Sequence, residues 1–156
     1  MAQSGYTPIQ IYYSTTTGNA PSAGNLLAGE LGLNIADMKL YCENSGGTVR
    51  MLTSPGIPQS GSSKTTSYSL AVTDVGQTIV VGTGGSITIP DATFSAGDAI
   101  LIFNDTTGNI TITCTITTAY IAGTDIDKAT MTLGTRGLAS ILFISGTVCV
   151  VTGNIA

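Results

Sequence analysis

The chain has 156 residues, a formal net charge of −4 at pH 7 and only 9% charged residues, against about 25% in an ordinary soluble domain. The five basic residues are scattered, so no cluster of them could neutralise a run of nucleic-acid phosphates. The sequence has no His, which removes the commonest general base and metal ligand. We therefore expect no nucleic-acid partner, no enzymatic activity, no metal and no cofactor.

A surface this poor in charge favours a subunit whose faces are covered by copies of itself or by a larger assembly. The alternative is a compact β domain with an uncharged surface rich in hydroxyl groups. Cys42, Cys114 and Cys149 each lie in an apolar run, so we expect three buried free thiols and assembly in a reducing cytoplasm. No signal peptide is visible at residues 1–4, and the apolar run 138–151 is broken by Gly146, so we expect no membrane span.

The first third of the chain predicts an arm and a small meander. Residues 1–8 form a loose arm, Ile9–Tyr13 is a β-branched and aromatic strand candidate, and residues 14–25 form a polar loop. Residues 26–52 contain three short apolar runs separated by Gly, Asn and Asp, which is typical of a meander of about three strands. We assign residues 1–52 to an attachment module and residues 53–67, rich in Pro, Gly and Ser, to a linker.

Residues 68–156 predict strands nearly end to end. The clearest alternation places Ile110, Ile112, Cys114 and Ile116 on one face and four Thr on the other. Strands at intervals of about 8–12 residues with a turn between each indicate a sandwich or barrel. The fold class we expect is therefore all-β, with a carboxyl-terminal antiparallel sandwich or barrel that is jelly-roll-like.

Residues 21–41 carry a spaced pattern of small, acidic and aromatic residues. Its members are Pro21, Ser22, Asn25, Leu26, Gly29, Glu30, Leu31, Asn34, Asp37, Lys39, Leu40 and Tyr41. The pattern resembles a module of virion structural proteins of tailed bacteriophages, which occurs in tail fibres and in head decoration (cement) proteins. The resemblance covers residues 7–52. The family usually has Gly after the Asp of this pattern, whereas this chain has Met38.

The end of the chain resembles the final hairpin of phage fibre-tip and decoration domains. Arg136-Gly137 precedes a strand, and the chain closes on Gly153-Asn154-Ile155-Ala156. Those domains usually have a Trp between the two features, where this chain has Cys149.

Three further features of the sequence have plainer explanations than a ligand site. Asp125 and Asp127 could offer oxygens to Ca²⁺, but a solvated loop tip explains them better. Gly82–Gly85 is followed by neither Lys nor a helix, so it predicts a hairpin turn and not a phosphate site. The Thr ladders could bind carbohydrate, although Thr on a strand face more often reflects β-propensity.

Two functions remain. The resemblance implies either a decoration protein, a homotrimer that binds the major capsid protein outside the head and stabilises the shell, or a tail-fibre protein that contacts the host surface. We favour decoration, because fibres carry a long shaft between the two modules. Localisation would be the virion. The residues we expect at a capsid or inter-subunit contact are Ile9, Ile11, Tyr12, Tyr13, Leu31, Leu33 and Tyr41.

Overall fold

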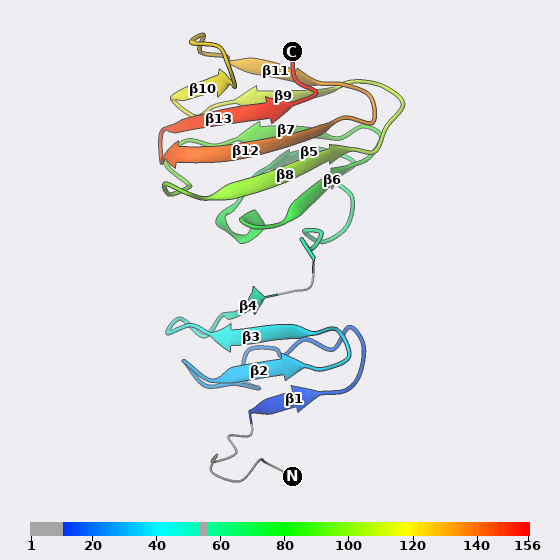
Figure 1. Ribbon diagram of the computed structural model, residues 1–156, viewed down its shortest axis with the longest axis vertical. Coiled ribbons are helices and arrows are strands. Elements are labelled where there is room, and N and C mark those ends of the chain that lie inside the picture. Colours follow the sequence, from blue (N-terminus) through cyan, green and yellow to red (C-terminus); the bar gives the residue numbers. More distant parts are fainter. Residues whose placement is uncertain (1–10, 54–55) are drawn as a thin grey trace. The chain divides into compact units, whose positions relative to one another are not determined.

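The structure is a computed structural model that describes residues 11–53 and 56–156. Its regular elements are thirteen strands and one short 3-10 helix, which confirms the prediction of an all-β chain (Figure 1). The chain divides into two compact units between Gly56 and Ile57.

The first unit is built on a single four-stranded sheet. Its strands are β1 (Tyr12–Ser14), β2 (Leu31–Asn34), β3 (Lys39–Glu43) and β4 (Val49–Thr53), paired in that order. Strands β2, β3 and β4 form the antiparallel meander that the turn residues predict. Strand β1 adds to β2 in parallel, and it covers the last two residues of the predicted strand Ile9–Tyr13. Ile9 lies outside the described residues.

The β2–β3 turn forms although the position after Asp37 holds no Gly. Met38 adopts a left-handed backbone conformation with φ of 55° and leaves 67% of its side chain exposed. A residue with a Cβ is strained in this conformation. The tight turn is therefore kept at some cost in stability.

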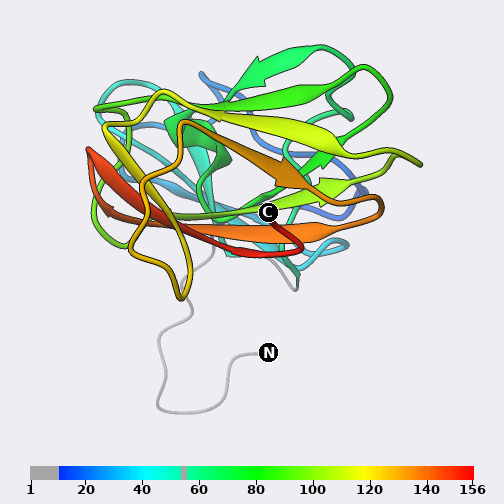
Figure 2. The same cartoon turned by 90° about the horizontal axis from the view of Figure 1, so that it is seen from above.

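The second unit contains two sheets. One has five strands in the order β10-β13-β12-β8-β6, and the other has four in the order β11-β9-β7-β5; Figure 2 shows them as separate layers. The elements are β5 (Ser67–Ser69), the 3-10 helix η1 (Val72–Asp74), β6 (Thr78–Val81), β7 (Ser86–Ile89), β8 (Ala99–Asn104), β9 (Ile110–Cys114), β10 (Thr118–Ile121), β11 (Thr130–Leu133), β12 (Leu138–Ser145) and β13 (Val148–Gly153).

Successive strands of the second unit alternate between the two sheets from β5 to β12. Strand β5 pairs in parallel with β7, β7 with β9, and β6 with β8. The chain therefore coils in a solenoid-like way through this part, and the antiparallel order predicted for the unit is wrong for these strands. Antiparallel pairing is found where β12 pairs with β8 and β13, and where β11 pairs with β9.

The core of the second unit forms from the alternate residues that each sheet turns inward. Ile110, Ile112, Cys114 and Ile116 are all buried, as their alternation predicts. Phe94 and Phe143 stack in the same cluster with ring centroids 3.9 Å apart. The other members from the strands are mainly Ile, Leu and Val.

Residues 57–66, which composition predicts as part of a linker, pair with the second unit. The amide of Ser60 donates to the carbonyl of Thr78 at 2.9 Å, and the amide of Lys64 donates to the carbonyl of Val80 at 2.8 Å. The segment thus runs along β6 at the edge of the five-stranded sheet.

Candidate interaction surfaces

The spaced pattern of residues 21–41 organises the loop of the first unit. Asn34 is 1% exposed, and its Nδ2 donates to the carbonyl oxygens of Thr16 and Asn19, each at 2.9 Å. Its Oδ1 accepts the amide of Asp37 at 3.0 Å, while the Asp37 carboxylate accepts the amide of Gly18 at 2.7 Å. These two side chains hold the loop to the β2–β3 turn.

Other members of the pattern close short turns within the same loop. Asn25 Oδ1 accepts the hydroxyl and the amide of Ser22, and Glu30 accepts the amide of Leu27 at 2.8 Å. Leu26 is 3% exposed and packs over Gly32, where an added Cβ would lie 3.4 Å from it. The pattern therefore specifies a folded loop over one face of the sheet, and this is a structural role for most of its residues.

The opposite face of this sheet is largely apolar and partly exposed, with the exposed Arg50 of β4 as a charged member. Tyr13 pairs with Leu33, Leu33 with Leu40, and Leu31 with Cys42, so all five side chains share that face. Tyr13 is 55% exposed and Leu31 is 37% exposed, while Leu33, Leu40 and Cys42 are half-buried. Three of the residues predicted at a contact thus lie together on one open face.

The remaining predicted contact residues lie elsewhere. Tyr12 is 62% exposed and lines a cleft of about 460 Å³ between β1 and the loop, together with Pro21 and Leu26; Tyr13 and Leu33 border the same cleft. Tyr41 is 9% exposed; burial, aided by the charge of Asp37, raises the pKa of its phenol. Ile11 is half-buried. The predicted contact residues share an apolar character, but side chains alternate along a strand, so these residues lie on different faces of the sheet.

The second unit has a mostly apolar outer face on its five-stranded sheet. Leu138, Leu142 and Ile144 of β12 are 48%, 45% and 50% exposed. Along the described strands of this sheet, no outward side chain is charged. The outward apolar side chains are Val80, Ala99, Leu101, Phe103, Tyr120, Leu138, Leu142, Ile144, Val148 and Val150.

The four-stranded sheet presents a different outer face, which we call the hydroxyl face. Its outward strand residues are all Ser or Thr: Ser67, Ser69, Ser86, Thr88, Thr111, Thr113, Thr130 and Thr132. Neighbours on adjacent strands are paired, as with Thr88 and Thr113 or Thr111 and Thr132. The Thr alternation that the sequence shows at 110–117 is thus one row of a larger array.

Asp74 is the most deeply buried carboxylate of the second unit, with an exposed fraction of 0%. It accepts hydrogen bonds from the hydroxyls of Ser60 at 2.5 Å and Tyr68 at 3.0 Å, and from the amide of Ala71 at 2.8 Å. Burial and this carboxylate raise the pKa of Tyr68, whose ring also carries the Lys64 ammonium 4.3 Å from its centroid. The cluster fastens residues 57–66 to β5 and η1.

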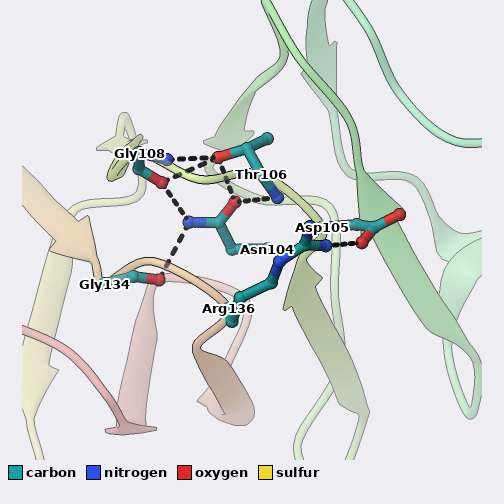
Figure 3. Close-up of polar contacts among 6 residues, drawn as sticks. All are labelled: Asn104, Asp105, Thr106, Gly108, Gly134 and Arg136. Carbon is teal, nitrogen blue, oxygen red and sulfur yellow. Dashed lines mark hydrogen bonds and ion pairs between the residues drawn. The ribbon is translucent and has the colours of Figure 1, made fainter.

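Asn104 joins two turns at one end of the second unit (Figure 3). Its buried Nδ2 donates to the carbonyl oxygens of Gly108 at 2.8 Å, Gly134 at 2.8 Å and Leu133 at 3.3 Å. Its Oδ1 accepts the amide of Thr106 at 3.0 Å and the hydroxyl of the same residue at 2.8 Å. All its hydrogen-bonding capacity is used internally, so this polar centre is structural.

Arg136 lies beside the Asn104 centre. It forms an exposed ion pair with Asp105 and has a left-handed φ of 54° (Figure 3). The next residue, Gly137, has no room for a side chain, because a Cβ there would lie 2.7 Å from the carbonyl oxygen of Gly134. Backbone geometry thus explains the Gly of the Arg-Gly sequence before β12.

All three cysteines are free thiols. Burial raises the pKa of Cys114 to about 11 and that of Cys149 to about 12, and the nearby charge of Asp127 adds to both. Cys42 is half-buried, not buried as predicted. Thiols with raised pKa values are poor nucleophiles and poor metal ligands at neutral pH.

Nothing in the described residues assembles a metal centre. Within 11–53 and 56–156, no three side chains of the His, Cys, Asp and Glu types lie close enough to hold an ion. Asp127 instead accepts the amide of Ala119 at 2.8 Å. In the same described ranges, no helix has the length and apolar character needed to cross a membrane.

No family model matches the chain, and no curated protein matches its sequence.

Proposed function

We propose that the protein is a structural subunit of a tailed-bacteriophage virion that decorates the head. The observation that carries the proposal is the largely apolar face of the first unit, where the exposed Tyr13 and Leu31 lie beside the half-buried Leu33. The resemblance of residues 21–41 supports a virion as the assembly that covers this face. The first unit then attaches to the major capsid protein.

The mechanism is added contact area and not chemistry. Burying apolar surface contributes about 25 cal/mol per Å², so many small contacts around a shell raise the force needed to separate its subunits. The low charge suits this role, because charged side chains are depleted in the buried centres of interfaces. We propose a homotrimer located in the virion, without enzymatic activity and without a nucleic-acid or membrane partner.

A variant test addresses the attachment face. In Leu31→Ser combined with Tyr13→Ser, the face loses its largest exposed side chains, so we expect binding to undecorated heads to weaken by about 100-fold. The matched control is Leu27→Ser, because Leu27 is 72% exposed in the same unit but lies in the loop. Equal binding by the double variant and the control would remove this face from the proposal.

The second candidate function is a tail-fibre or receptor-binding protein. The observation that favours it is the hydroxyl face, whose paired Ser and Thr side chains offer donors and acceptors to a carbohydrate of the host surface. Binding of the purified protein to host cells, together with no binding to heads, would support this function over decoration.

A further inference from the structure

The outer face of the five-stranded sheet has no covering element of its own unit. Leu138, Leu142 and Ile144 of β12 point outward, with Ser140 between the first two, and each is about half exposed. Their neighbours across the strands are also apolar: Phe103 pairs with Leu138, and Val150 pairs with Leu142. We propose that this face, and not the first unit, is the surface through which copies of this chain associate with one another.

The charge of the face indicates a second copy as its occupant. No outward side chain on the described strands of this sheet is charged, although the chain carries a net charge of −4. Two copies can therefore meet here without bringing like charges together. A charged partner would have to bury its own charges against a surface that offers no counter-charge, which is unfavourable.

The other sheet of the same unit provides an internal comparison. It also turns one face outward, and that face carries hydroxyl groups that water can solvate. Both sheets are built from the same kinds of strand. An apolar outward face is therefore specific to the five-stranded sheet and is not shared by the whole unit. The apolar face is the one whose exposure to water costs free energy.

The face itself specifies which surface associates and not how many copies meet there. The trimer number rests on the proposed function, whereas the choice of face rests on the burial pattern alone.

The experiment measures the molar mass of the purified full chain in solution by sedimentation equilibrium. We expect the wild type to be a trimer and Leu142→Glu to be a monomer, with a dissociation constant raised by about 100-fold or more because symmetry places the new charges near one another. Thr111→Glu introduces the same charge on an exposed strand position of the hydroxyl face and should remain a trimer. A monomeric wild type at tens of micromolar, or a Leu142→Glu variant that associates like the wild type, would overturn the inference.

A second variant tests whether a lower molar mass of Leu142→Glu could result from misfolding. Leu138→Thr combined with Leu142→Thr keeps β-propensity and removes apolar surface, so it should also lower the molar mass while its circular dichroism stays that of the wild type. Because no heads are present, the result is independent of attachment. A trimer that fails to bind heads counts against the proposed function alone, and a monomer that binds heads counts against this inference alone.

Discussion

The phenol of Tyr68 donates a 3.0 Å hydrogen bond to the fully buried carboxylate of Asp74, and no Lys or Arg forms a salt bridge with that carboxylate in the described residues. Hydroxyl and amide donors stabilise the charge instead. Since Ser60 is one of these donors, the same carboxylate fixes the path of the chain as it enters the second unit.

Replacing Asp74 with Ala should destabilise the second unit. The hydroxyls of Ser60 and Tyr68 and the amide of Ala71 would lose a buried acceptor, and such donors cost about 1–3 kcal/mol each when left unpaired. Allowing for partial relaxation, we expect the free energy of unfolding to fall by about 3 kcal/mol. Urea unfolding midpoints measure the loss.

The control for this variant is Asp91→Ala. Asp91 is exposed and accepts the amide and the hydroxyl of Thr117, at 2.9 and 3.0 Å. Water can replace it, so we expect a loss below about 1 kcal/mol. Equal losses in the two variants would show that burial of Asp74 does not determine its contribution.

Stability should fall at alkaline pH because the two buried thiols must ionise. Unfolding returns each thiol to a pKa near 9.0, whereas in the folded state Cys114 and Cys149 have pKa values of about 11 and about 12. The protonated form is favoured in the folded state, so stability is kept below pH 9.0 and is lost as pH rises toward about 12. Thermal unfolding across this range measures the loss.

Cys149→Ala should flatten this pH profile without abolishing the fall. The raised pKa values of Tyr41 and Tyr68 act in the same direction and remain in the variant. A variant profile parallel to that of the wild type would contradict the assignment to Cys149.

Asn104→Asp should destabilise the protein in a pH-dependent way. A carboxylate at this position would face the carbonyl oxygens of Gly108, Leu133 and Gly134 with no proton to donate. We expect a loss of about 3–5 kcal/mol near neutral pH, and burial should raise the pKa of the new carboxyl group. The deficit relative to the wild type should therefore shrink as pH falls through that pKa, which chemical unfolding at about pH 4 and about pH 8 would detect.

Met38→Gly should stabilise the first unit. The substitution relieves a left-handed Cβ at an exposed position and should add about 0.5–1 kcal/mol. Gly47→Ala is the converse control, because Gly47 has a φ of 73° and no atom lies near its Cβ position. Its free energy of unfolding should fall by a similar amount. Amide hydrogen exchange across β2 and β3 measures both. Unchanged exchange in both variants would show that neither turn limits stability.

The sequence predicted the strands and their faces better than their partners. The alternation at Ile110–Ile116 and the turn residues of the meander are local signals, and the structure has strands at both places. Tyr68 of β5 pairs in parallel with Ile87 of β7. The chain between these two strands passes through the other sheet, as β6, before it returns. No local pattern encodes such a pairing, so an antiparallel order was expected.

The candidate surfaces were predicted only in part, for the same reason. The long loop separates Tyr13 from Leu31 and Leu33 in the sequence, and the strand register brings all three to one face. Tyr41 points to the other face. The sequence did not predict the apolar face of the second unit. Leu142 and Ile144 lie in the same strand as the core residues Ile141 and Phe143, so apolar character alone does not tell the outward residues from the inward ones. A signal was present, since this run is apolar at consecutive positions, which indicates a strand buried on both faces.

The most direct test of the decoration account is to incubate the purified full chain with undecorated phage heads, sediment the heads and count the bound copies. The account predicts saturable binding at a fixed, high copy number per head. It also predicts that decorated heads withstand heating or loss of divalent cations better than bare heads. Absence of binding to heads at micromolar protein, with binding to host cells instead, would contradict it and favour the receptor-binding function.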